Sequence, residues 1–134
     1  MGTWLLSLES MSNVTTTVDT YLAMWNETDA ARRARHIELA WAADGSYVDP
    51  QLEARGHAAL GDMVGAVHSR FPGYRFRRVS GVDAHHDSVR FAWELAGPDG
   101  TVAVAGVDFG VLASDGRLRS ITGFFGDLPD DAAA

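Results

Sequence analysis

The sequence predicts an α+β fold in which three N-terminal helices pack on a curled, cone-shaped antiparallel sheet and enclose a pocket. Apolar residues in the first half recur every three or four positions, which is typical of helices. In the second half they alternate with polar residues, which is typical of strands. Helices followed by a run of antiparallel strands predict this fold class, and a sheet that curls around helices leaves room for a pocket.

The first two helices are predicted from their periodicity and their caps. The first spans residues 14–26, and the second runs from about Ala30 to Ala42 with Thr28 or Asp29 as its N-cap. Asp44-Gly45 is expected to end the second helix. The positions predicted to face inward are Val14, Val18, Tyr21, Leu22 and Trp25 in the first helix and Ala34, Ile37 and Trp41 in the second.

A short extended piece and a third helix follow. Residues 46–49 are expected to be extended, because Pro50 disfavours the helical conformation for the residue before it. The third helix begins after Gly56 and ends at Pro72-Gly73. Its inward positions are Leu60, Val64, Val67 and Phe71.

The remaining chain is predicted to form a meander of strands. Strands are expected over residues 74–83, 89–96, 101–113 and 117–125. The hairpin between the second and third of these is indicated by Gly97-Pro98-Asp99-Gly100, a sequence rich in turn residues.

Composition limits the classes of function. The 134 residues fit one domain over 1–134, with an ordered core at about 14–128. The absence of cysteine excludes disulfides, thiolate metal sites and a Cys nucleophile. A net charge of -7 disfavours nucleic acid as a partner. No apolar run is long enough to span a membrane, the N-terminus does not resemble a signal peptide, and a cytoplasmic location is expected.

Other motifs are unremarkable. Two groups of arginines, Arg32, Arg33 and Arg35 and then Arg75, Arg77 and Arg78, are expected to lie on solvated faces. His85-His86-Asp87 contains metal-binding residue types, but adjacent turn residues point in different directions, so no metal site is expected. The chain contains no P-loop, dinucleotide fingerprint or G-x-S-x-G elbow, so no cofactor is expected.

Asp108 is the most informative candidate for chemistry. It is the only charged residue between positions 103 and 112, and it shares a strand face with Val104, Gly106, Gly110 and Leu112. Burial of an unpaired carboxyl group raises its pKa, and a protonated carboxyl group can donate a hydrogen bond. The alternative is an edge-strand carboxylate that faces water.

Four further candidates have ordinary structural alternatives. Tyr47 and Asp49 share one face if their segment is extended, although an Asp before proline is also a common turn residue. Tyr21 lies on the inward stripe of the first helix, where a tyrosine is usually part of the core. His68 lies at the edge of the inward stripe of the third helix and either lines the pocket or is satisfied locally.

Three local patterns together resemble the SnoaL-like polyketide cyclases and ketosteroid isomerases of the nuclear-transport-factor-2-like superfamily. They are the helix-ending segment 21–26 (YLAMWN), the segment 43–50 that closes in Asp-Pro (ADGSYVDP), and 107–109 (VDF) followed by 115–118 (DGRL). The resemblance extends over residues 16–126.

The resemblance implies chemistry next to a carbonyl group. By similarity, Asp49 acts as general base, and Tyr21 and Asp108 bind a developing enolate oxygen. The ligand is then a small, apolar, carbonyl-bearing molecule of polycyclic or polyketide type, and the reaction is an isomerisation or an aldol cyclisation. The side chains expected to contact it are Trp25, Tyr47, His68, Trp93 and Phe124.

A second class of function stays open, because many members of this superfamily are non-catalytic binding or dimerisation modules. The enzyme interpretation is favoured if Asp49 and Asp108 face one closed pocket with Tyr21 beside them, and the module interpretation is favoured if either acid faces solvent. A homodimer is expected, since both faces of the last strand are apolar: Leu118 and Phe124 on one, Ile121 and Phe125 on the other. One face can line the cone and the other needs cover.

Overall fold

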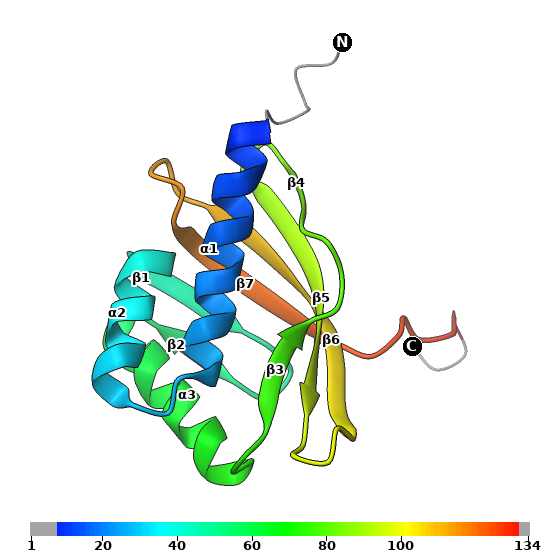
Figure 1. Cartoon of the computed structure of the whole chain (residues 1–134). Coiled ribbons are helices and arrows are strands. Elements are labelled where there is room, and N and C mark those ends of the chain that lie inside the picture. Colours follow the sequence, from blue (N-terminus) through cyan, green and yellow to red (C-terminus); the bar gives the residue numbers. More distant parts are fainter. Residues whose placement is uncertain (1–7, 132–134) are drawn as a thin grey trace.

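Three helices cover one side of a strongly curled sheet in the computed structural model, which describes residues 8–131 (Figure 1). Residues 1–7, to which the expectation about a signal peptide largely applies, and 132–134 lie outside the described residues. The predicted fold class is confirmed. In chain order the elements are α1 (Leu8–Asn26), α2 (Ala30–Ala40), β1 (Trp41–Val48), β2 (Glu53–Arg55), α3 (His57–Arg70), β3 (Arg75–Arg78), β4 (Asp83–His85), β5 (Ser88–Ala96), β6 (Val102–Leu112) and β7 (Leu118–Phe125).

The sheet has the strand order β2-β1-β7-β6-β5-β3, and β4 also pairs with β5. The meander β5-β6-β7 is antiparallel, as expected. The sheet as a whole is mixed, because β1 pairs in parallel with β7, with Tyr47 beside Ile121. Parallel pairing requires a long connection, and here the connection contains α3 and the strands β2 to β6. This pairing places the end of β1 beside β7, whose other neighbour is β6.

The predicted stripe of α1 forms the centre of the core. Val18 and Tyr21 are fully buried, and Val14, Leu22 and Trp25 are nearly so. Asp29 is the N-cap of α2, since its carboxylate accepts a hydrogen bond of 2.9 Å from the backbone N–H of Arg32. The stripe of α1 and the start of α2 therefore agree with periodicity and capping, whereas α1 begins at Leu8, six residues before its predicted start, and Ala34 of α2, predicted to face inward, is exposed.

The predicted end of α2 is wrong. The helix stops at Ala40, and Trp41 already belongs to β1, so Asp44 and Gly45 lie inside a strand. The register of β1 against β7 shifts between Trp41 and Ser46, which places a bulge-like irregularity at this Asp-Gly pair. Turn-forming residues thus bend a strand here instead of ending a helix.

Two further differences concern short strands. The predicted strand over residues 74–83 is divided into β3 and β4, and both parts pair with β5. The strand β2 was not expected, because three residues are too few to show an alternating pattern. It pairs with β1 and extends the sheet beside α3.

Arg33 is buried, which contradicts the expected solvated face for this residue. Its side chain is 7% exposed. The guanidinium group donates to three backbone carbonyls: Nε to Glu27 at 3.1 Å, Nη1 to Gly61 at 3.1 Å and Nη2 to Thr28 at 3.3 Å. Arg33 therefore joins the α1–α2 turn to α3, a role that only the tertiary structure reveals.

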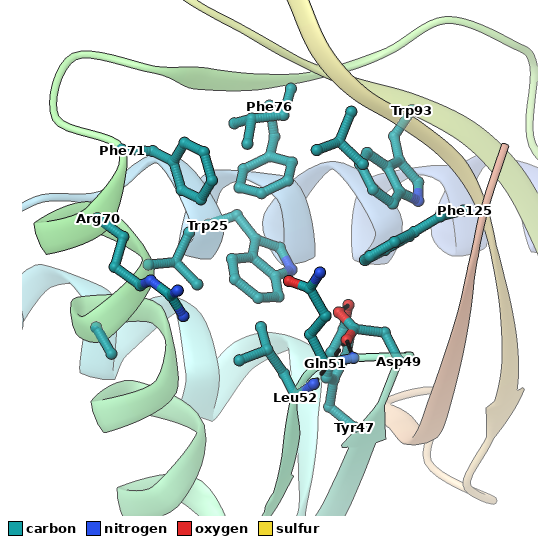
Figure 2. A pocket seen from close by; sticks show the side chains of 14 residues that line it. Trp25, Tyr47, Asp49, Gln51, Leu52, Arg70, Phe71, Phe76, Trp93 and Phe125 are labelled. Atoms are coloured by element: carbon teal, nitrogen blue, oxygen red, sulfur yellow. Dashed lines mark hydrogen bonds between the residues drawn. The ribbon is translucent and has the colours of Figure 1, made fainter.

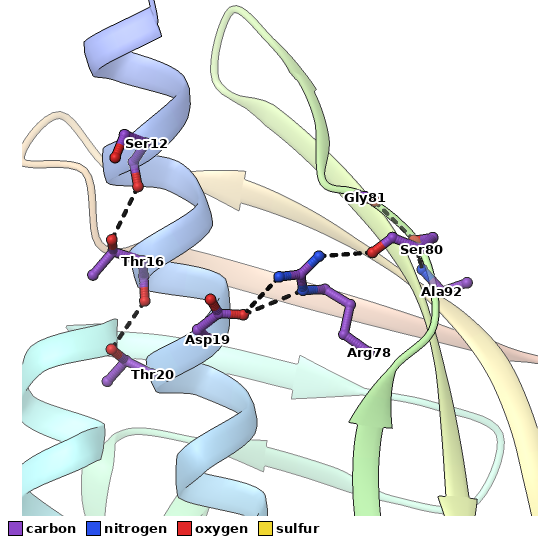
Figure 3. Close-up of polar contacts among 8 residues, drawn as sticks. All are labelled: Ser12, Thr16, Asp19, Thr20, Arg78, Ser80, Gly81 and Ala92. Carbon is purple, nitrogen blue, oxygen red and sulfur yellow. Dashed lines mark hydrogen bonds and ion pairs between the residues drawn. The ribbon is translucent and has the colours of Figure 1, made fainter.

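The outer edge of α1 is tied to the sheet by Arg78 (Figure 3). Its guanidinium donates to Asp19 of α1 at 3.0 and 3.2 Å and to the carbonyl of Ser80 at 2.7 Å. The Ser80 hydroxyl in turn accepts from the backbone N–H of Ala92 at 2.8 Å.

Within residues 8–131, no helix combines the length and apolarity needed to cross a membrane.

Candidate functional site

A pocket of about 220 Å³ opens between α3, the C-terminal end of α1 and the sheet (Figure 2). Its walls are mostly apolar, and six of the lining side chains are aromatic: Trp25, Tyr47, Phe71, Phe76, Trp93 and Phe125. The polar lining consists of Tyr47, Asp49, Gln51 and Arg70. A mostly apolar cavity with a few convergent polar groups is the usual form of a small-molecule site.

The carboxylate of Asp49 is held in a fixed position directly after β1. The Tyr47 hydroxyl donates to Oδ2 at 2.6 Å, so these two side chains meet as their spacing predicts. The backbone N–H groups of Gln51 and Leu52 both donate to Oδ1 at 2.8 Å. Asp49 is thus a pure acceptor whose orientation is set by a local turn.

Tyr47 is kept in its protonated form. Burial raises the pKa of its hydroxyl far above the ordinary value, and the negative charges of Asp108 and Asp49 raise it further. The hydroxyl therefore acts as a hydrogen-bond donor toward Asp49 at every physiological pH.

Asp108 lies deeper than Asp49 and is only 3% exposed. Its two oxygens accept hydrogen bonds from the Tyr21 hydroxyl at 2.7 Å and from the Trp93 indole N–H at 2.9 Å. Burial raises the pKa of Asp108 to about 6, the negative charge of Asp49 adds to this effect, and the two hydrogen bonds oppose it. The pKa of Asp108 is thus shifted upward, in the direction predicted from the sequence. Because a pKa of about 6 lies below neutral pH, the carboxyl group is mainly ionised there and accepts hydrogen bonds instead of donating them.

Gly123 brings the two carboxylates together. It pairs with Asp108 across β6 and β7. A Cβ atom at this position would lie 2.9 Å from Asp108 Oδ1, 3.2 Å from Asp49 Cβ and 3.3 Å from the Tyr47 hydroxyl oxygen. Only a glycine leaves room for both acidic side chains to converge on this strand.

Gly106 makes room in the same way for Trp93, its partner on β5. A Cβ atom at Gly106 would lie 2.7 Å from Cζ2 of the Trp93 ring. The indole can therefore lie across β6 with its N–H on Asp108 while its ring lines the pocket. Gly106 on β6 and Gly123 on β7 thus make room for the side chains that line the pocket and for the buried Asp108.

Not all the expected site residues reach the pocket. Trp25, Tyr47, Asp49 and Trp93 line it. Asp108 and Tyr21 do not; they form a buried layer that is linked to the pocket through Trp93. From the sequence, Asp49, Asp108 and Tyr21 were all expected to face the ligand, whereas in the structure only Asp49 lines the pocket.

Phe124 lies on the outer face of the sheet and is 62% exposed, whereas its neighbour Phe125 lines the pocket. The register of β6 against β7 shifts between Val111 and Leu112, so Leu118 and Ile121 are both buried. This irregularity breaks the strict alternation from which Leu118 and Phe124 were expected to share a face.

The histidines lie outside the pocket lining. His68 Nε2 is 2.6 Å from the backbone carbonyl of Trp25, so this side chain supports the end of α1 behind the pocket. His85 and His86 lie on an exposed turn with their Nδ1 atoms 3.0 Å apart. In the described part of the chain, no three acidic or histidine side chains gather in a way that could hold a metal ion.

Several pocket residues were not expected from the sequence. Gln51, Leu52, Arg70 and Phe76 belong to three separate segments, and no local pattern links these segments. One signal was available in Asn26, the last residue of α1. Its side chain donates to the carbonyl of Phe76 at 2.8 Å and accepts from the N–H of Phe76 at 2.7 Å, which holds this aromatic side chain against Trp25.

Comparisons with known proteins place this fold and site in context. No family model matches the chain, and no curated protein matches it. Among solved structures, a SnoaL-like family protein from Agrobacterium tumefaciens str. C58, for which an isomerase function has been suggested, is 37% identical. The similarity covers 87% of this chain and 99% of that one, with a TM-score of 0.82. The chain therefore belongs to the SnoaL-like family.

More distant structures show the same fold. A protein of unknown function with a cystatin-like fold from Methylobium petroleophilum PM1 is 18% identical, covering 96% of this chain and 84% of that one with a TM-score of 0.70. A SnoaL-like protein from Jannaschia sp. CCS1, for which a polyketide cyclase function has been suggested, is also 18% identical. That similarity covers 83% of this chain and 85% of the other, with a TM-score of 0.63.

Proposed function

We propose that this protein is an acid–base enzyme in which Asp49 removes a proton next to the carbonyl group of a small apolar ligand. The observation that carries the proposal is the position of the Asp49 carboxylate, which lines an aromatic pocket and is oriented by three donated hydrogen bonds. A general base is effective when its carboxylate is fixed within hydrogen-bond reach of the proton that it takes. The suggested isomerase and polyketide cyclase functions of two relatives belong to reaction types of this kind.

The chemical step is a proton transfer that forms an enolate. The C–H bond next to the carbonyl breaks, its proton moves to an oxygen of Asp49, and the electron pair becomes the enolate. An isomerase returns the same proton to another carbon of the conjugated system. In a cyclase the enolate carbon forms a bond to a second carbonyl carbon, the π bond of that carbonyl breaks to give an alkoxide, and the alkoxide takes the proton back from Asp49. The side-chain amide of Gln51 makes no hydrogen bond to the described part of the chain, so it is available to donate to the enolate oxygen.

Tyr21 and Asp108 have a different role in this proposal from the one that the family resemblance implies. The Tyr21 hydroxyl donates a hydrogen bond to Asp108 below the pocket, and Asp108 also accepts one from the Trp93 indole N–H. We therefore assign them to holding the Trp93 ring as a wall of the site. They do not contact the ligand in this scheme.

The test uses a ketone that is small enough for the pocket, 1-tetralone, in deuterium oxide. The wild-type protein is expected to exchange the C2 protons of 1-tetralone faster than buffer alone, and Asp49→Asn is expected to abolish this acceleration, as followed by NMR. An amide at position 49 can still accept from both backbone N–H groups, so the fold is expected to persist. Undiminished exchange by a folded Asp49→Asn variant would reject the general-base role.

A non-catalytic binding module is the second candidate function. It is favoured by one observation, namely that the hydroxyl groups of Tyr21 and Tyr47 and the indole N–H of Trp93 all donate to carboxylates already. Few donors are then left to stabilise an enolate. Binding of 1-tetralone without any accelerated exchange would favour this candidate.

We also propose that the protein forms a homodimer through the outer face of the sheet. Four apolar side chains are exposed there, Val48, Val107, Phe109 and Phe124, on the adjacent strands β1, β6 and β7. Val107 and Phe124 are direct partners across the strands, so the patch is continuous. A second copy is the occupant that we favour, because a two-fold contact covers the same uncharged patch on both subunits, so that these apolar side chains cover each other.

A further inference from the structure

Arg70 is a cation that lines the pocket, and no acidic side chain of the described residues pairs with it. It lies in the last turn of α3. Arg77, Arg78, Arg90 and Arg117 each form an ion pair with a carboxylate. Among the other arginines of the described chain, which form none, only Arg70 lines the pocket. Asp49 and Arg70 are the only charged side chains of the described chain that line this pocket.

The two charges lie on different sides of the aromatic space. Figure 2 shows Arg70 and Asp49 on either side of the Trp25 ring in this view, with Arg70 carried by α3 and Asp49 by the segment after β1. A cation at a helix C-terminus also complements the helix dipole, and this effect accounts for a positive charge at that position. The helix dipole does not explain why the Arg70 side chain lines the pocket. A ligand with a negative group would explain this position.

The volume of the pocket limits the ligand that can lie between these charges. An apolar cavity of about 150 Å³ is large enough to bind benzene. A pocket of about 220 Å³ with walls of Trp25, Phe76 and Trp93 therefore fits a flat ligand of one or two rings. A larger polycyclic molecule would have to extend out of the mouth.

We propose that the ligand is a planar ketone of one or two rings that carries a carboxylate, which Arg70 binds at the mouth while the C–H next to the ketone lies against Asp49. A guanidinium group binds a carboxylate through two parallel hydrogen bonds, which fixes the orientation of the ligand as well as its affinity. The position of the reacting carbon rests on the proposed function. The binding of the carboxylate by Arg70 does not.

The experiment compares 1-tetralone-6-carboxylate with its methyl ester, which lacks the negative charge and is larger by one methyl group. Binding is followed by the fluorescence of the tryptophans, two of which line the pocket. The wild-type protein is expected to bind the carboxylate about tenfold more tightly than the ester. Arg70→Gln is expected to remove this preference while leaving the affinity for the ester unchanged, and Arg70→Lys to retain part of it.

The matched control is Arg35→Gln, which removes an exposed arginine of α2 that does not line the pocket. It changes the net charge by the same amount, so unchanged affinities in this variant separate direct contact from the overall field of the protein. Equal affinity of the wild-type protein for both probes, an equal loss for both probes in Arg70→Gln, or no binding of either probe at millimolar concentration would each overturn the inference.

Exchange of the C2 protons in the same samples separates this inference from the proposed function. A carboxylate preference that depends on Arg70, in the absence of exchange, supports the ligand class and rejects the acid–base role of Asp49. Exchange of both probes at equal affinity supports the acid–base role and rejects the assignment of Arg70.

Discussion

At the scale of single residues, Asp108 couples the stability of the protein to pH. Its carboxyl group is buried against Tyr21 and Trp93, and its pKa is raised from 3.8 to about 6. A raised carboxyl pKa means that the folded state holds a proton at a pH where the unfolded chain has released it. The free energy of unfolding therefore falls as pH rises from the unfolded pKa to the folded pKa, and the full penalty applies above about 6.

Replacement of Asp108 by Asn tests this coupling. The amide oxygen can accept from the Trp93 N–H and the amide nitrogen can donate to the Tyr21 hydroxyl, so the shape and both contacts persist. Relative to the wild-type protein, Asp108→Asn is expected to gain about 3 kcal/mol in the free energy of unfolding between pH 4 and pH 7. Urea denaturation of both proteins at a series of pH values measures this difference.

Tyr21→Phe provides the complementary variant. It removes a hydrogen bond that favours the ionised carboxylate, so the pKa of Asp108 is expected to rise above that in the wild-type protein. Carboxyl NMR titration measures the pKa directly. A stability difference between Asp108→Asn and wild type that is independent of pH would show that Asp108 is not the buried, titrating group described here.

Asp49 and Asp108 stand out in the sequence, because an Asp before proline and an acid in an otherwise uncharged strand are visible there, while the role of these residues and of Tyr21 in a site stays a prediction. The partners of these residues were not visible. Trp93 reaches Asp108 because Gly106 leaves space beside it, and both acids approach β7 at Gly123, where a side chain would contact them. Such contacts depend on strand register, which the sequence leaves open.

At the scale of elements, the end of α1 is fixed to β3 by Asn26. This side chain makes two hydrogen bonds to the backbone of Phe76, in the way that a neighbouring strand would. The contact sets the distance between Trp25 and Phe76, whose ring centroids are 5.0 Å apart. The aromatic wall of the pocket therefore depends on a polar contact behind it.

Asn26→Ala is expected to reduce the free energy of unfolding by about 2 kcal/mol, because it leaves the partly buried N–H and C=O groups of Phe76 without partners. It is also expected to weaken the binding of 1-tetralone through the displaced Phe76 ring. Urea denaturation and tryptophan fluorescence measure the two effects.

Asn13→Ala, an exposed asparagine on the same helix, is the matched control and is expected to change both quantities little. Equal stability of the wild-type protein and Asn26→Ala would contradict the proposed role of Asn26 in fixing α1 to β3.

The elements themselves were largely predictable, and two of the exceptions share one cause. The stripe of α1, the positions Leu60, Val64 and Val67 of α3 and the alternation in β5 correspond to buried positions, as periodicity predicts, whereas Phe71, expected to face inward, follows the end of α3 and is 36% exposed. Prediction failed where β1 and β7 depart from regular pairing, at Asp44-Gly45 and between Leu118 and Ser120. A strand irregularity changes which face a residue occupies without leaving a distinctive composition.

At the scale of the whole molecule, the exposed apolar patch on the outer face of the sheet predicts self-association. The wild-type protein is expected to sediment as a dimer at micromolar concentration, and Phe124→Glu, which places a charge at the centre of the patch, is expected to sediment as a monomer. Leu39→Glu is the control, because Leu39 is 69% exposed on α2, away from the sheet face. A monomeric wild-type protein would contradict the expected dimer.

The central claim is that Asp49 acts as a base toward a ligand held in one orientation in the pocket. The most direct test is the stereochemistry of deuterium incorporation at C2 of 1-tetralone, since a fixed carboxylate reaches only one face of a fixed ring. The wild-type protein is expected to replace one of the two C2 protons first and Asp49→Asn to replace neither above the rate in buffer. Equal replacement of both protons, or acceleration that survives in Asp49→Asn, would contradict the claim.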